Sequence, residues 1–524
     1  MGERRSSWLL GIVALVLTLP SVIALAGVDN GVTRATATVD GVPVTTLVAD
    51  PSTRHPVVVV AHGFAGSAQL MDDLGLAIAR AGYATVLLDF SGHGRNGTPL
   101  PTPGSDAETA ALQQDLTAVV DWSVRQPWAA PARLALVGHS MGAGAVVRDA
   151  VADAGGARRI GATVAISLPS AADLPAGQAS VPRDLLLLVG GAEQQAFTDA
   201  ALAGLRAAYP TASLGDDLGS SADGTARSAQ VVPRADHVTI LFSGDTYQRT
   251  VDWLDTTVGA PSSGHSVGGS RVGWLLMLTV GAAIGFVPLA RLAFMRSPGP
   301  LPAAVPADWP VVLGVTLGAS AVASLVAAAL PAVASRVPLA VGGHVMLWFA
   351  VAGLVSFAAA RLLRRRSPVV SAEGPADVAD TGRFAWGDLA ATFVMTSYAV
   401  VALGLVAQHT WTAFAFAGDR EHWLLLVEVA FLTWFWADDR LVRRRWWLGL
   451  LTRVVAVAVL LLSVRVLAAP GFLTLLVPLM AAVLGLLLVY GQTVTCRARL
   501  PWAAALVQAI PLAYLVTTTF PLVS

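Results

Sequence analysis

The feature that most constrains the fold is a series of long apolar segments after residue 271. About 20 apolar residues in a helix cross a bilayer, and helices or closed barrels alone satisfy their backbone groups in lipid. The whole chain of 524 residues is 55% hydrophobic and 13% charged, too apolar for a soluble protein of this size. We therefore predict an all-α polytopic membrane domain over 272–524. Its eight expected spans are 272–292, 309–330, 338–360, 387–407, 422–437, 446–464, 472–491 and 501–522.

A ninth apolar segment, 8–26, lies near the N-terminus and is preceded by Arg4 and Arg5. Ala24-Leu25-Ala26 fits a signal-peptidase site, so the segment could be a signal peptide. Its long apolar run favours a retained anchor, which we place at 1–27. Either interpretation carries the residues that follow it to the extracytoplasmic side.

Arginines near the span ends give the predicted orientation in the cell membrane, because cytoplasmic loops are rich in basic residues. With the N-terminus inside, nine spans leave the C-terminus outside and make four of the later loops cytoplasmic. Those loops carry Arg291 and Arg296; Arg361, Arg364, Arg365 and Arg366; Arg440, Arg443, Arg444 and Arg445; Arg497 and Arg499. The opposite loops carry only Arg336, Arg420 and Arg465.

Two charged residues lie inside predicted spans, where ionisable groups are costly. Glu428 and Arg453 fall at similar depths when counted from the cytoplasmic ends at about 1.5 Å per residue. We expect them to form an ion pair. A dense row of intramembrane charges is absent from the sequence, which argues against an ion-coupled carrier.

A different signal occupies the first half of the chain, the pentapeptide Gly138-His139-Ser140-Met141-Gly142. It follows an apolar strand-like run, 134–137, and precedes a helical stretch, 143–152. A G-x-S-x-G between a strand and a helix is a nucleophile elbow, a tight turn that exposes the serine hydroxyl. Ser140 is therefore the candidate nucleophile.

A serine hydroxyl needs a base to take its proton and an acid to orient that base. His237 follows a short strand-like run, 229–232, and is the candidate base. Glu193 follows the buried run 184–191 and is the first candidate acid, with Asp173 as the runner-up. Asp236 is the weakest candidate, because adjacent loop residues rarely face each other.

The developing oxyanion needs two backbone N–H donors. One is expected from Met141, which follows the nucleophile. The other is expected from Phe64, since Gly63 lets the backbone after strand 56–61 approach closely. His62 is expected to be structural.

Apolar strands alternate with amphipathic helices along this half, which predicts an α/β fold with a mostly parallel sheet covered on both faces. A hairpin over 34–50 is expected to precede it. Expected strands are 57–61, 84–89, 133–137, 160–167, 185–190 and 229–233, and expected helices are 69–81, 107–127, 141–153, 195–208 and 246–257.

Taken together, residues 33–258 resemble an α/β-hydrolase domain of the esterase, lipase and serine-peptidase type. The segments that carry the resemblance are His62-Gly63-Phe64, Asp89 to Gly94, the elbow, Gly190-x-x-Glu193 and Ala235-Asp236-His237. Glu193 stands where the family more often has Asp. The resemblance implies a Ser–acid–His triad that forms an acyl-enzyme, without a cofactor or a metal. Asp89 and His93 are expected to build a loop.

We expect a hydrolase domain over 28–258, a Gly/Ser-rich linker over 259–271 and the membrane domain after it. The segment 169–183 is too short for a folded cap, which predicts an open site for a bulky or membrane-borne substrate. A flexible loop is expected over 214–227.

The leading hypothesis is a membrane-embedded serine hydrolase that cleaves acyl esters of lipid or envelope origin. Its expected partners are the bilayer and an acyl-ester or lipid-like substrate. Zero net charge without a basic patch argues against nucleic acid, and Cys496 alone excludes an intrachain disulfide. The alternatives are an acyltransferase, a peptidase, or a transporter or scaffold with a regulatory hydrolase-like domain. The sequence favours no oligomeric state.

Overall fold

The structure, a computed structural model, describes residues 2–154, 159–259, 271–295, 307–366, 386–442, 444–467, 469–498 and 500–524. The predicted linker falls almost wholly outside these ranges, as do Arg296, Arg443 and Arg499 of the charge pattern. The chain divides into two compact units. The sheet unit comprises Ile23–Leu275, Ala407–Asp419 and Pro521–Ser524, and the helical unit comprises Met1–Val22, Leu276–Val406 and Arg420–Phe520.

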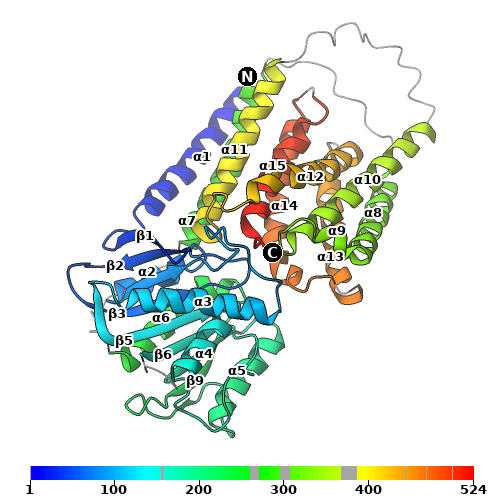
Figure 1. The fold of residues 1–524 in the computed structure, drawn as a ribbon. Helices are drawn as coiled ribbons and strands as arrows, with labels where there is room; N and C mark the ends of the chain where they lie inside the picture. The colour runs from blue at the N-terminus through cyan, green and yellow to red at the C-terminus, as the bar shows by residue number, and fades with distance from the viewer. Residues whose placement is uncertain are drawn as a thin grey trace. The chain divides into compact units, whose positions relative to one another are not determined.

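A nine-stranded sheet forms the centre of the sheet unit, in the order β1-β2-β4-β3-β5-β6-β7-β9-β8 (Figure 1). The strands from β4 to β9 in this order are parallel, while β1, β2 and β8 are antiparallel to their neighbours. Their bounds are β1 Thr33–Val39, β2 Val42–Val48, β3 His55–Ala61, β4 Ala84–Leu88, β5 Ala129–His139, β6 Ile160–Ile166, β7 Leu185–Gly190, β8 Asp217–Leu218 and β9 Arg227–Val232.

Helices cover both faces of this sheet, as the continuous apolar strands require. On one face lie α3 (Asp106–Ser123), α4 (Met141–Ala154) and α5 (Gln195–Ala208). On the other, α2 (Asp72–Arg80) and α6 (Gly244–Thr257) contact each other and the strands. The predicted α/β fold with a mostly parallel sheet is confirmed.

Two predictions about connections can be compared with this unit. Residues 169–183 contain only turns and bends, without a helix or strand, as expected for a chain that lacks a folded cap. The stretch 214–227, predicted as a flexible loop, contains β8, which pairs with β9.

Two short segments from the region predicted as membrane domain pack within the sheet unit. Leu522 donates its N–H to the Gly92 carbonyl and accepts from the Leu100 N–H, at 2.8 Å each. Farther upstream in the chain, the Trp411 carbonyl accepts a hydrogen bond of 2.8 Å from Ser67. Ser67 belongs to the loop after β3, and Gly92 and Leu100 belong to the loop after β4. Both loops are therefore held by hydrogen bonds to residues that lie beyond position 400 in the sequence.

The helical unit is built from nine longer helices in the described ranges (Figure 1). They are α1 Gly2–Ala26, α7 Val272–Ala293, α8 Trp309–Ala329, α10 Gly342–Arg366, α11 Trp386–Thr410, α12 Arg420–Val442, α13 Trp446–Val466, α14 Leu473–Thr495 and α15 Ala503–Thr519, with the short α9 Pro331–Ala334 between α8 and α10. Each coincides with one predicted span.

Seven of these helices are long and apolar enough to cross a membrane, among the residues described. The two others are the charged α12 and the 17-residue α15. Seven such helices indicate a membrane protein. The nine-span topology and the side of the membrane stay predictions.

The predicted ion pair between Glu428 and Arg453 is wrong. Arg453 Nη1 instead donates to Asp438 Oδ2 at 2.9 Å, and its Nη2 donates to Gln508 Oε1 at 2.6 Å. All three side chains are buried. The prediction compared only the depths of Glu428 and Arg453 along their helices. Asp438, also on α12, is the carboxylate that contacts Arg453 on α13.

Candidate active site

Ser140 occupies the turn between β5 and α4 with a left-handed backbone, φ +53°. The glycines on either side are required by close backbone approach. A Cβ on Gly138 would lie 2.3 Å from the Gly142 carbonyl oxygen, and one on Gly142 would lie 2.5 Å from the Ala61 and His62 carbonyl oxygens. The sequence G-x-S-x-G therefore folds into a strained elbow because its ends pack against the chain without room for side chains.

His237 lies between Ser140 and Glu193 and contacts both side chains. His237 Nε2 is 3.0 Å from Ser140 Oγ, and His237 Nδ1 is 3.3 Å from Glu193 Oε2. Glu193 follows β7 and His237 follows β9, neighbouring parallel strands whose carboxyl ends meet at one edge of the sheet. The three residues predicted from the sequence as nucleophile, base and acid are thus brought into one hydrogen-bonded row.

Glu193 is held from the side opposite the histidine. Its Oε1 accepts hydrogen bonds from the Ser167 hydroxyl at 2.5 Å and from the Gly190 N–H at 3.0 Å. The Glu193 side chain is completely buried. With Oε1 fixed by two donors, Oε2 is left for His237.

His139 was not singled out as functional by the sequence, yet it supports the base. Its Nε2 is 2.9 Å from the His237 carbonyl oxygen, which makes it the donor there. Burial, together with the neighbouring His237, holds the pKa of His139 well below its ordinary value, so its ring stays neutral. The Phe197 ring packs against the imidazole ring of His237, with 4.4 Å between the two ring centroids. The only sequence signal for this role is the position of His139 directly before the elbow serine.

The two predicted oxyanion donors lie on the elbow and on the loop after β3. Met141 is the first residue of α4, so its N–H has no acceptor within the helix. Phe64 follows Gly63, where a Cβ would lie 3.1 Å from Ser140 Cβ. That close approach places the loop carrying Phe64 beside the serine.

The remaining sequence candidates have other partners. Asp173 forms a salt bridge of 3.1 Å with Arg148, and Asp236 accepts the N–H groups of Val238 and Thr239. His62 is buried between the Gly63 carbonyl and the Phe90 N–H, and burial lowers the pKa of its ring. These contacts suit structural roles.

Asp89 and His93 hold the loop after β4, as expected. Asp89 accepts from the N–H groups of Ala68 and Arg95. The His93 ring packs edge-on against Phe64 with 5.7 Å between centroids. No group of three His, Cys, Asp or Glu side chains that could bind a metal occurs in the described ranges.

Comparison with known proteins identifies the type of domain. Residues 52–177 match the model of a family described as serine aminopeptidase, S33. This match includes Ser140 and ends before Glu193 and His237. Together with the sheet topology, it shows an α/β-hydrolase domain followed by a helical region.

The curated relatives are uncharacterized proteins. One, from the traX–finO intergenic region of Escherichia coli, is 29% identical over 120 residues, which is 22% of this chain and 39% of that protein. Another, from Mycobacterium tuberculosis, is 34% identical over 96 residues, covering 18% of this chain and 32% of that protein. The chain thus spans 32% to 39% of the length of these relatives.

Solved structures similar to the chain include two hydrolases. An esterase of Pyrococcus furiosus is 18% identical and covers 45% of this chain and 96% of its own, with a TM-score of 0.33. A dienelactone hydrolase of Anabaena variabilis is 17% identical and covers 43% of this chain and 98% of its own, with a TM-score of 0.32.

Proposed function

We propose that this protein is a serine hydrolase that cleaves acyl esters through an acyl-enzyme on Ser140. The observation that carries the proposal is the row in which His237 contacts Ser140 Oγ at 3.0 Å and Glu193 at 3.3 Å. An unactivated serine is a weak nucleophile, and this arrangement supplies the base that it needs.

In the proposed reaction Ser140 Oγ attacks the acyl carbonyl while His237 Nε2 takes the hydroxyl proton. The N–H groups of Phe64 and Met141 stabilise the oxyanion. His237 then protonates the leaving alcohol, and an acyl-serine remains. Water attacks the acyl-serine with His237 as the base, which releases the acid and restores Ser140. Throughout, Glu193 holds the histidine tautomer and stabilises the imidazolium.

The proposed substrate is an acyl ester from lipid or from the cell envelope. Two features support this choice: the seven long apolar helices that indicate a membrane protein, and the lack of a folded cap over 169–183. An extracytoplasmic catalytic domain, which the arginine pattern favours, would meet such substrates directly. Acyl transfer and peptide cleavage would use the same residues, and the family description also fits a peptidase.

The direct test is labelling of the purified full-length protein with a fluorophosphonate probe. Wild type should be labelled, and Ser140→Ala should not. Ser170→Ala, which removes an exposed hydroxyl on the 169–183 loop, is the matched control and should label like wild type. A folded wild-type protein that resists labelling would refute the proposal.

Substrate class follows from a panel of chromogenic esters and anilides. We expect p-nitrophenyl acyl esters to be cleaved faster than aminoacyl p-nitroanilides, with both rates lost in Ser140→Ala. Faster cleavage of the anilides would identify a peptidase instead.

A further inference from the structure

A polar cavity lies in the sheet unit. It has a volume of about 280 Å³, near the lower end of the ~300–1,000 Å³ typical of small-molecule pockets. Strands β1, β2 and β4 and the loop before α2 line it, together with residues next to α7 and at the end of α11. Neither Ser140, His237 nor Glu193 contributes to its lining.

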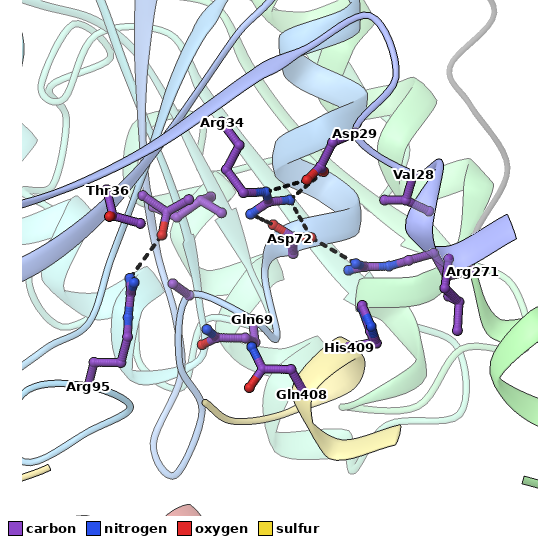
Figure 2. A pocket seen from close by; sticks show the side chains of 14 residues that line it. Val28, Asp29, Arg34, Thr36, Gln69, Asp72, Arg95, Arg271, Gln408 and His409 are labelled. Carbon is purple, nitrogen blue, oxygen red and sulfur yellow. Dashed lines mark hydrogen bonds and ion pairs between the residues drawn. The ribbon is translucent and has the colours of Figure 1, made fainter. Parts of the chain in front are cut away.

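The carboxylates in this cavity are already occupied by arginines (Figure 2). Arg34 donates to both oxygens of Asp29 and to both oxygens of Asp72. Arg271 donates to Asp72 from the other side, at 2.8 Å, and also pairs with Asp73. Hydrogen bonding by Arg34 lowers the pKa of Asp29, which keeps that carboxylate ionised. The acids therefore have little capacity left to accept a bond from a ligand.

The amide oxygens in the cavity are occupied as well. The Ser67 hydroxyl proton is shared between Gln69 Oε1 at 2.9 Å and the Trp411 carbonyl at 2.8 Å, and Gln408 Oε1 accepts from the Phe414 N–H at 2.7 Å. In both side chains the oxygen is used internally and the NH₂ group remains.

What is left in the cavity is a set of donors. Arg271 Nη2 is buried without a hydrogen-bond partner among the described residues, and the Arg271 side chain is only 5% exposed. Arg95 uses Nε for Asp89 and Nη2 for Thr45, which leaves Nη1. With the Gln69 and Gln408 amides, the cavity presents four donor groups to a ligand. Such a set fits an oxygen-rich anion, because charge-assisted bonds from guanidinium are the strong ones.

The cavity also lies where three candidate membrane helices end. Leu25 and Val28 line it at the C-terminus of α1, Arg271 directly precedes α7, and Gln408 and His409 belong to the last turn of α11. Span ends lie at the level of the lipid headgroups. The anion that this level supplies in greatest amount is a phosphate ester.

We propose that the cavity binds a phosphate ester, supplied by the headgroup of a membrane phospholipid. Arg95 Nη1 and Arg271 Nη2 donate to the phosphate oxygens, and the amides of Gln69 and Gln408 complete the contacts. The four carboxylates of Asp29, Asp72, Asp73 and Asp89 outnumber the three guanidinium groups of Arg34, Arg95 and Arg271, so recognition depends on directed donors and not on a net positive charge.

The test uses two nearly isosteric variants, Gln69→Glu and Gln408→Glu, alone and combined. Each keeps the oxygen that accepts the internal bond and replaces the donor NH₂ with a carboxylate oxygen. Gln178→Glu, on an exposed loop outside the cavity, adds the same charge as a control. Binding of phosphatidylglycerol to delipidated full-length protein in detergent is measured by native mass spectrometry, with thermal unfolding as the check on folding.

We expect the double variant to bind phosphatidylglycerol at least tenfold more weakly than wild type, and Gln178→Glu to bind like wild type. Glycerol 3-phosphate and inorganic phosphate identify the source of the anion. Binding of the lipid alone supports a headgroup site, while equally tight binding of the soluble phosphates supports the anion site and overturns its assignment to lipid. Equal lipid binding by wild type and a folded double variant overturns the proposal.

Discussion

Glu193 is the residue on which the proposed chemistry depends most sharply after Ser140 itself. Its side chain is completely buried, and its two carboxylate oxygens have separate partners: Ser167 and Gly190 on one, His237 on the other. A buried carboxylate in this position fixes the tautomer that leaves His237 Nε2 able to accept the serine proton.

Replacing Glu193 with Gln should therefore slow fluorophosphonate labelling of Ser140 by roughly 10³- to 10⁴-fold at neutral pH, as loss of the negative charge does in other triads. Second-order labelling rates provide the measurement. Asp173→Asn removes a carboxylate that contacts Arg148 and should leave the rate unchanged. If Asp173→Asn were the slow variant, the acid would have been misassigned.

Asp184 gives a stability test that is independent of catalysis. Burial raises its pKa to about 6, above the ~3.9 of an unfolded Asp. The folded protein therefore holds this proton more tightly than the unfolded chain, and that contribution to stability is lost as pH rises from about 4 through 6.

Asp184→Asn keeps an oxygen to accept the Ala226 N–H and never ionises. We expect the variant to melt at a higher temperature than wild type at pH 8, by the equivalent of about 1–3 kcal/mol, and to match it near pH 4. Melting curves of both proteins between pH 4 and 8 test this. A difference that did not change with pH would contradict it.

At the level of elements, α4 offers two glycines with opposite roles. A Cβ on Gly142 would meet two carbonyl oxygens at 2.5 Å, whereas a Cβ on Gly144 would meet only the end of the flexible Arg148 side chain at 3.3 Å.

Gly142→Ala should destabilise the protein by about 1–3 kcal/mol through overpacking, and should slow labelling of Ser140. Gly144→Ala should be neutral or stabilising by up to ~1 kcal/mol, because Ala is the better helix former. Thermal unfolding of the two variants side by side makes the comparison. Equal losses would mean that the elbow is not tightly packed.

The strands and the elbow could be predicted from the sequence because local patterns specify them. Five buried residues in a row, 57–61, require a covered parallel strand, and two glycines around Ser140 require a sharp turn. Chain order alone then placed Glu193 and His237 at neighbouring strand ends. The support from His139 depends on a backbone contact 98 residues away, which no local pattern encodes.

The partner of Arg453 could not be predicted for a related reason. Depth along a helix follows from counting residues, but the direction in which each side chain points depends on how α12 and α13 pack. The same limit applies to Asp173, whose neighbour Arg148 belongs to a different element.

The Arg453 pair yields a matched experiment. Asp438→Asn leaves a buried guanidinium without its counter-charge and should destabilise the helical unit by roughly 3 kcal/mol. Glu428→Gln, on the same helix but without contact to Arg453, should change the melting temperature in detergent little. Greater sensitivity at Glu428 would restore the pairing expected from depth.

For the whole molecule, the pairing of residues 521–524 with the loop after β4 ties the end of the chain to the proposed oxyanion side. Leu522 bonds to Gly92 and Leu100, and next to Gly92 the His93 ring packs on Phe64. Residues 521–524, the tail of this chain, thus contact the loop that carries His93, and His93 in turn contacts Phe64, a proposed oxyanion donor.

Leu522→Pro removes the N–H donated to Gly92 and should cost about 1 kcal/mol or more, since a buried carbonyl loses its partner. Val523→Pro is the matched control, because no described residue accepts from the Val523 N–H. We expect a lower melting temperature and slower Ser140 labelling in Leu522→Pro alone. Identical behaviour of the two variants would show that the strand-like pairing contributes nothing.

The same tail sets an order of events during synthesis. Leu100 and Ser524 are 424 residues apart, an interval of roughly 20–85 s of translation at ordinary rates. All the helices between them must leave the ribosome before the tail can reach its partner loop. A newly made chain therefore carries its nucleophile elbow long before the loop beside Phe64 is closed, and the hydrolase domain gains this contact only after α15 has been made.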